Sequence, residues 1–127
     1  MSTQDVLEIT QLIHRYNQAA DSGDGAVFAS TFVAEGLIEL PDEDPIAGTE
    51  ALSAFGDAIP NTVPGARHWV NNIVVDVKDE IATARMYLIV VIAGSPPTPM
   101  LSGIYQDELV RTDDGWRFVK RSVTVDD

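Results

Sequence analysis

The chain changes its hydrophobic periodicity about halfway along. In the first half, apolar residues recur at steps of three or four, which predicts amphipathic helices. The first helix carries an apolar stripe formed by Val6, Ile9, Ile13, Tyr16 and Ala20. Ser2 followed by Asp5 is typical of the N-terminal cap of such a helix. Residues 21–25, rich in Asp, Ser and Gly, predict its end.

Two more helices and a short strand are predicted before residue 65. Asp24 can cap a short second helix in which Phe28 and Phe32 form an i, i+4 pair. Residues 37–40 predict a strand, and residues 41–45 carry two prolines and three acidic residues, which predict a surface loop. A third helix has Leu52, Phe55 and Ile59 at helical spacing, and Pro60 is expected to end it.

The second half of the chain predicts four long strands. Residues 67–77, 81–93, 100–112 and 116–125 are rich in Val, Ile, Tyr and Trp. Short connections within the first and last pairs predict antiparallel neighbours. Helices followed by long antiparallel strands indicate one α+β domain spanning residues 1–127. Strands this long must curl, so we expect a cone-shaped barrel whose hollow side is covered by the first helix and encloses an apolar pocket.

Strict alternation assigns the strand side chains to faces. On the first long strand it puts His68, Val70, Asn72 and Val74 on one face. The opposite face is then apolar, with Trp69, Ile73, Val75 and Val77, and its burial against a second copy predicts a homodimer. On the last strand it puts Arg121 on one face with Val119, Val123 and Val125. A charge among valines needs a partner if that face is buried.

The composition narrows the possible functions. The net charge is −12, which argues against nucleic-acid binding, because phosphate contacts need clustered Lys and Arg. There is no cysteine, which excludes disulfides and thiolate metal sites. The acidic loop 41–45 lacks the ligand spacing of a calcium loop, so we expect no metal. The start of the chain does not resemble a signal peptide, and the longest apolar run, residues 86–93, is too short to span a membrane. We therefore expect a cytoplasmic protein.

His68 and Asp21 are the residues best placed for chemistry. His68 opens a strand on a mostly apolar face, and Asp21 lies where the first helix ends, at the unfavourable end of the helix dipole for a carboxylate. A neutral imidazole beside a carboxylate can act as a general base. A structural histidine and a turn-forming aspartate fit the same sequence, and both interpretations remain open here. His14 lies off the apolar stripe and is expected on the surface.

Several segments resemble SnoaL-like domains of the nuclear transport factor 2 superfamily. They are residues 15–24 (RYNQAADSGD), 67–72 (RHWVNN), 103–109 (GIYQDEL), 115–118 (GWRF) and 120–121 (KR). The resemblance covers nearly the whole chain in the same order. It implies a curved sheet wrapped around N-terminal helices, a scaffold that hosts dehydratases, isomerases, cyclases and binding modules.

Within that superfamily the sequence is most similar to the branch of scytalone dehydratase and hexachlorocyclohexane dehydrochlorinase. That likeness implies an Asp21–His68 dyad, with Arg121 and Tyr16 as polarising groups. A second pocket histidine known from scytalone dehydratase has no counterpart here, because His14 is the only other histidine. We further expect contacts to a ligand from Trp69, Asn72, Phe28, Phe55 and Tyr105.

The expected function is a cofactor-independent lyase or isomerase that acts on a small, largely apolar molecule, cyclic ones included. The alternative is a non-catalytic ligand-binding or dimerisation domain of the same fold. An enzyme of this kind needs His68 within about 3.2 Å of Asp21, or one water apart. In a binding module the two should lie farther apart, with Arg121 paired to Asp107 or Glu108.

Overall fold

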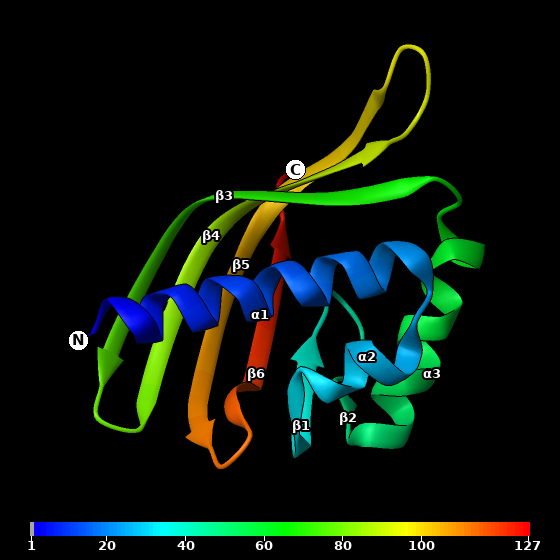
Figure 1. The fold of residues 1–127 in the computed structure, drawn as a ribbon. Coiled ribbons are helices and arrows are strands. Elements are labelled where there is room, and N and C mark those ends of the chain that lie inside the picture. Colours follow the sequence, from blue (N-terminus) through cyan, green and yellow to red (C-terminus); the bar gives the residue numbers. More distant parts are fainter. Residues whose placement is uncertain (1) are drawn as a thin grey trace.

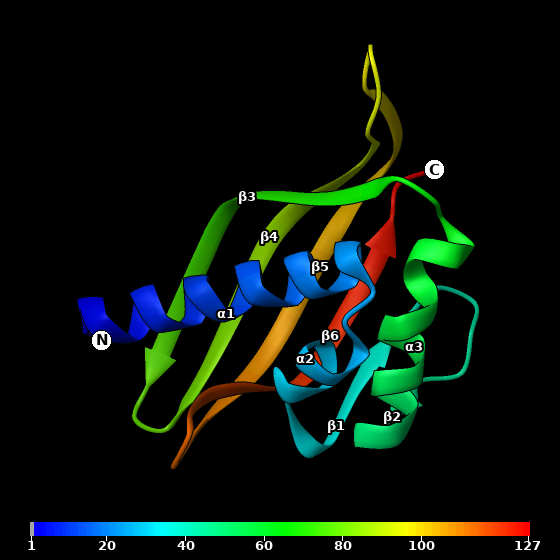
Figure 2. The ribbon, with the colours of Figure 1, turned by 45° about the vertical axis from the view of Figure 1, so that its right-hand side comes forward.

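A single curved sheet carries three helices on its hollow side (Figure 1). The computed structural model describes residues 2–127. The longest helix, α1, runs across the hollow face, and α2 and α3 cover one end of the sheet (Figure 2). The elements are, in order, α1 (Thr3–Ser22), α2 (Gly25–Ser30), β1 (Phe32–Glu39), β2 (Ile46–Ala47), α3 (Thr49–Thr62), β3 (Ala66–Lys78), β4 (Ile81–Ile92), β5 (Thr98–Thr112) and β6 (Gly115–Val125).

The sheet has six strands in the order β2-β1-β6-β5-β4-β3. Strand β1 runs parallel to β6, and all other neighbours are antiparallel. The prediction of an α+β fold is confirmed, as are the four long strands within a few residues. The parallel pairing of β1 with β6 was not predicted. It adds β1 and β2 to one edge of the sheet, and α3 packs beside them (Figure 2).

Helix α1 begins and ends where its caps predict. The Asp5 backbone N–H donates to the Ser2 hydroxyl at 3.1 Å, and Gly23 adopts the left-handed conformation, with φ 73°, that ends a helix. The predicted apolar stripe is buried from Ile9 to Ala20. None of the helices in the described part of the chain is long and apolar enough to cross a membrane.

Two helix boundaries differ from the prediction. Helix α2 ends at Ser30 and Phe32 begins β1, opposite Phe118, so Phe28 and Phe32 do not share a helix although their rings pack at 6.0 Å. Strand β1 therefore starts five residues before the predicted strand. Pro60 lies inside α3 and does not end it. Because proline has no N–H, the last turn of α3 lacks one backbone hydrogen bond. The Val63 N–H still donates to the Ile59 carbonyl at 2.9 Å.

Two β-bulges overturn the predicted strand faces. In β3 the register shifts between Asn71 and Val74, and Asn72 has φ 53°. Beyond this bulge the faces exchange: Val75 is buried and Val74 is 59% exposed. The prediction that Val75 lies on the outer face with Trp69 is therefore wrong.

A second bulge lies in β6, where the pairing shifts between Glu108 and Leu109 of β5. Val119 is the extra residue and is 39% exposed, whereas Arg121 is fully buried. The prediction that these two residues share a face is therefore also wrong. The shift turns Phe118 and Arg121 toward the hollow side of the sheet together.

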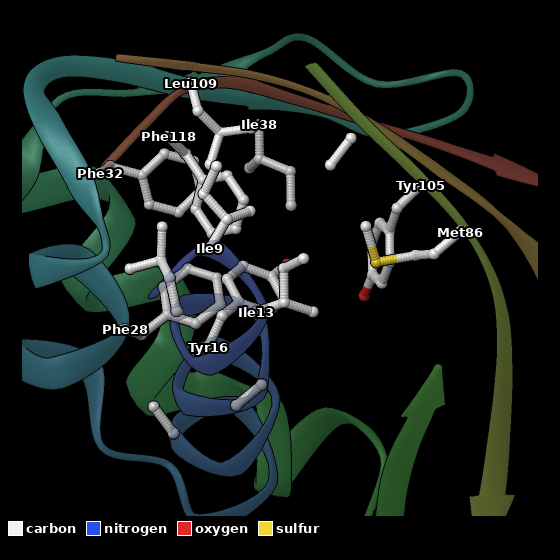
Figure 3. Packing of buried hydrophobic residues seen from close by; sticks show 14 of the residues in the cluster. Ile9, Ile13, Tyr16, Phe28, Phe32, Ile38, Met86, Tyr105, Leu109 and Phe118 are labelled. Atoms are coloured by element: carbon white, nitrogen blue, oxygen red, sulfur yellow. The ribbon is translucent and has the colours of Figure 1, made fainter. Parts of the chain in front are cut away.

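Tyr16 lies at the centre of an aromatic cluster under α1. Its ring centroid is 4.6 Å from that of Phe28, 5.8 Å from Phe118 and 5.9 Å from Tyr105. In Figure 3, Tyr105 and Met86, from neighbouring strands of the sheet, lie together and face Tyr16 from across the core. The cluster joins α1 to the strands β1, β5 and β6.

Candidate active site

An apolar cavity of about 240 Å³ lies beside this aromatic cluster, between α3, Tyr16 of α1 and the sheet. Aliphatic and aromatic side chains, such as Phe55, form most of its wall. The polar side chains in the wall are those of Tyr16, Thr62, His68 and Tyr105. The predicted apolar pocket is therefore present, with few polar groups, which is typical of sites for small molecules.

Asp21 and His68 meet at the wall of this cavity. Asp21 lies in the last turn of α1, and His68 is near the start of β3. The two Asp21 carboxylate oxygens accept the His68 backbone N–H at 3.1 and 3.2 Å, and Asp21 Oδ1 lies 2.7 Å from His68 Nδ1. This double attachment fixes the orientation of the ring. It leaves the other ring nitrogen, Nε2, for a ligand.

His68 separates the cavity from an outer groove. It lines both, while Asp21, Asn17 and Trp69 line the groove alone. The His68 side chain is 17% exposed. The carboxylate therefore lies on the solvent side of the imidazole and the apolar cavity on the other. This is the arrangement in which a carboxylate can stabilise an imidazolium that forms next to a bound ligand.

Arg121 lies behind the cavity wall and is fully buried. Its Nε donates to Asp107 Oδ1 at 2.8 Å and its Nη2 to Asp107 Oδ2 at 3.2 Å. The guanidinium carbon is 3.6 Å from the ring centroid of Tyr105 and 4.3 Å from that of Tyr16. Nη1 has no hydrogen-bond partner within residues 2–127. The partner expected for a buried arginine is thus Asp107, and the two tyrosine rings lie over the charge.

The two tyrosines remain protonated. Burial raises the pKa of Tyr16 well above its ordinary value of 10.0, and it raises the pKa of Tyr105 as well. Burial also raises the pKa of the Asp107 carboxyl, and the opposing effect of Arg121 is smaller. Tyr16 and Tyr105 therefore offer neutral hydroxyl groups at the cavity, which can donate hydrogen bonds.

The remaining predicted contact residues divide into two groups. Phe55 and Tyr105 line the cavity as expected. Phe28 is buried in the aromatic cluster against Tyr16, Trp69 is exposed on the outer face, and Asn72 is exposed at the bulge. Trp69 follows His68 directly, so its side chain must point to the opposite face. The bulge places Asn72 away from the cavity.

Sequence reasoning missed Thr62 as a polar group of the wall. Thr62 follows Ile59 by three positions on α3, so the helical spacing pointed to it. The predicted helix stopped at Pro60, two residues before Thr62, so Thr62 was left outside it.

Metal binding is not supported by the side chains of residues 2–127. No group of three or more His, Asp or Glu side chains there is arranged to hold an ion.

The sequence profile of the SnoaL-like domain family matches residues 1–122. An uncharacterized protein of Mycobacterium tuberculosis, Rv2910c, is 28% identical over 124 residues, which cover 94% of this chain and 84% of that protein.

Solved structures agree in fold. A protein of unknown function from Mycobacterium tuberculosis, Rv3472, superposes with a TM-score of 0.86 at 31% identity. The match covers 95% of this chain and 71% of Rv3472. A nuclear transport factor 2-like protein with a cystatin-like fold from Novosphingobium aromaticivorans superposes with a TM-score of 0.89 at 28% identity. That match covers 98% of this chain and 83% of the other protein. The resemblance to the superfamily is confirmed, and this chain is a member of the SnoaL-like domain family.

Proposed function

We propose that this protein is a cofactor-independent lyase or isomerase that removes a proton from a small, largely apolar carbonyl compound. The observation that carries the proposal is the 2.7 Å contact between His68 Nδ1 and Asp21 Oδ1 at the wall of an apolar cavity. The carboxylate fixes both the ring and the backbone of His68. A general base benefits from such a fixed ring, because its free nitrogen must point at the substrate.

The reaction follows from the positions of the polar groups. His68 Nε2 takes a proton from the carbon next to the carbonyl; the C–H electron pair forms the C=C bond of an enolate, and the π pair of the carbonyl moves onto its oxygen. Asp21 stabilises the imidazolium. The hydroxyls of Tyr16 and Tyr105 donate hydrogen bonds to the oxyanion. The oxyanion pair then re-forms the carbonyl. Either the His68 proton is returned to another carbon of the conjugated enolate, which is isomerisation, or the enolate expels a leaving group from the adjacent carbon and that group leaves with the His68 proton, which is elimination. Neither route requires a metal or an organic cofactor.

Arg121 acts through the tyrosines in this proposal. It is absent from the cavity wall, and its guanidinium lies against the rings of Tyr16 and Tyr105. Its charge favours negative charge on an oxygen that those hydroxyls contact. Arg121 is therefore a positioning residue rather than a catalytic one.

A structurally similar protein supports a ligand-binding role for this scaffold. The protein is from Catenulispora acidiphila, is 26% identical with a TM-score of 0.85, and was solved in complex with S-DNPA.

Proton exchange tests the proposal without knowledge of the natural substrate. A panel of small cyclic ketones is incubated with the protein in heavy water, and deuterium incorporation next to the carbonyl is followed by NMR. We expect His68→Gln to lower the exchange rate by about 10²–10⁴-fold. The free energy of unfolding should change far less.

His14→Gln is the matched control, because His14 is the other histidine and is exposed on α1. It should keep the wild-type rate. Equal rates for wild-type protein and His68→Gln would contradict the proposal. So would the lack of protein-dependent exchange for every ketone in the panel.

The alternative is a binding module without catalysis. One observation favours it: Arg121 is paired with Asp107, as expected for a module that only binds. The same panel separates the two functions. A protein that binds the ketones, measured by calorimetry, without exchanging their protons is a binding module.

A further inference from the structure

We infer that the cavity selects uncharged ligands and excludes carboxylates and phosphates, including acyl groups carried on a phosphate-bearing cofactor. The inference deepens the proposed function and uses the same cavity, but it concerns binding and does not require that any reaction occurs. It rests on two observations: the cavity wall carries no lysine or arginine within residues 2–127, and exposed carboxylates follow two of its lining residues directly in sequence.

No lysine or arginine belongs to the cavity wall in residues 2–127. Arg121 is the nearest buried cation, and it is paired with Asp107 and covered by Tyr16 and Tyr105. Arg67 adjoins two residues of the wall in sequence, but it lines the outer groove on the other side of His68. An anionic ligand would therefore leave water without finding a lysine or arginine, and the imidazole of His68 already faces the Asp21 carboxylate, so burying the anion is strongly unfavourable.

The mouth of the cavity is the part of its edge where the lining residues are exposed. In the sequence, carboxylate side chains come directly after two of these residues. Pro41 and Val125 line the cavity and are exposed at its edge. Asp42, Glu43 and Asp44 come next after Pro41, and all three are exposed.

The second group of carboxylates follows Val125 at the end of the chain. Asp126 is held in place there: its N–H donates to the Ser102 carbonyl at 2.9 Å, and its carboxylate accepts the Ser102 hydroxyl at 2.7 Å. Ser102 follows Leu101, which also belongs to the cavity wall. Asp126 therefore stays beside the part of the wall formed by Leu101 and Val125.

Lys120, a basic side chain close in strand register to Leu40, is already paired with a carboxylate. Lys120 Nζ lies 3.1 Å from Glu39 Oε1, one residue before Leu40 of the cavity wall. The mouth thus repels anions, and it does so most at low ionic strength, because exposed charges are screened by salt. Neutral ligands meet neither the repulsion nor the cost of burying a charge.

Three ligands with one ring system test the inference. They are 1-tetralone, a tetralone carboxylic acid and the methyl ester of that acid, which matches the acid in size. Affinities are measured by isothermal titration calorimetry at about 0.02 M and about 0.5 M salt. With wild-type protein we expect the ketone and the ester to bind, and the acid to bind at least about tenfold more weakly than the ester.

Two variants with equal changes in net charge locate the effect. The mouth variant is Asp42→Asn with Glu43→Gln and Asp44→Asn, and the control variant is Asp79→Asn with Asp113→Asn and Asp114→Asn. The control positions lie in the two turns at the far end of the sheet (Figure 1). At low salt the mouth variant should bind the acid about three- to tenfold more tightly than wild type, and ester binding should not change. The control variant should behave as wild type.

Several outcomes would overturn the inference. One is an acid that binds as tightly as its ester, and another is an equal gain in both variants. Failure of ketone and ester alike to bind would count against the cavity as a ligand site and against the proposed function too. Selective binding of the neutral ligands without proton exchange would support the inference and contradict only the proposed enzyme.

Discussion

Arg121 and Asp107 show how one buried pair can join the core to the site. Both side chains are fully buried, and the pair lies between the aromatic cluster and the sheet. Burying two charges costs several kcal/mol, which the pairing offsets only if neither partner is lost. The pair therefore adds little to the free energy of unfolding, but removing one of its two partners should lower that free energy strongly.

Breaking the pair from one side should destabilise the protein strongly. Arg121→Met leaves the Asp107 carboxylate buried without a cation, and we expect a loss of about 3–5 kcal/mol in the free energy of unfolding at pH 7, measured with urea. The double variant Arg121→Met with Asp107→Leu should recover most of this loss. A double variant no more stable than the single one would contradict the account.

The pH dependence of the single variant follows from the same carboxyl. Burial already raises the Asp107 pKa in the wild type, and losing Arg121 raises it further. A raised carboxyl pKa means that the folded state binds the proton more tightly than the unfolded state, so acid favours folding at this position. The stability deficit of Arg121→Met relative to the wild type should therefore shrink as the pH falls from 7 toward 4.

At the level of elements, Asp5 attaches the start of α1 to the far end of β5 and β6. Its Oδ1 accepts Arg111 Nη2 at 2.7 Å and Trp116 Nε1 at 3.1 Å, and its Oδ2 accepts the Ser2 hydroxyl at 2.8 Å. The hydrogen bonds from Ser2 and Trp116 lower the Asp5 pKa below its ordinary 3.8, and Arg111 adds to this. The opposite end of α1 carries Asp21, so this attachment helps to hold the helix that presents the dyad.

Acid should release this attachment. A lowered carboxyl pKa contributes stability that is present above about pH 4 and is lost as the pH falls through the lowered value. Asp5→Asn should therefore have a lower thermal midpoint than wild type at pH 7, and the two midpoints should converge in acid. Glu35→Gln, at an exposed position on β1, is the control and should track wild type at every pH. A constant difference between Asp5→Asn and wild type would contradict this.

The sequence predicted elements better than it predicted their faces. Caps and periodicity located α1 and the four long strands, because those signals are local. The orientation of Ile73, Val75 and Val119 was missed, because one extra residue in a strand reverses every later side chain and depends on pairing with a distant partner. Asp21 and His68 were found through the family resemblance and their positions at element ends, whereas no local pattern could show that Arg121 lies behind the tyrosines.

For the whole molecule, the predicted homodimer stays a prediction, now with different residues. The outer face of the sheet carries Trp69 opposite Ile89, with Tyr87 two residues away, and these side chains are 53%, 37% and 52% exposed. Such a patch favours association. We expect sedimentation to show a dimer that Ile89→Lys converts to monomer. Leu7→Lys, at an apolar position on α1 that is 54% exposed, should stay dimeric, and a wild-type monomer at all concentrations would contradict the prediction.

The two tryptophans lie at opposite ends of the molecule in contrasting surroundings. Trp116 is buried against Asp5 and Arg111, and Trp69 is exposed beside His68. Their fluorescence should therefore report different events: the signal of Trp116 follows the unfolding of the whole chain, and that of Trp69 follows changes at the dyad and on the outer face. Trp69→Phe and Trp116→Phe would separate the two signals, so the protein carries its own optical probes for folding and for the site.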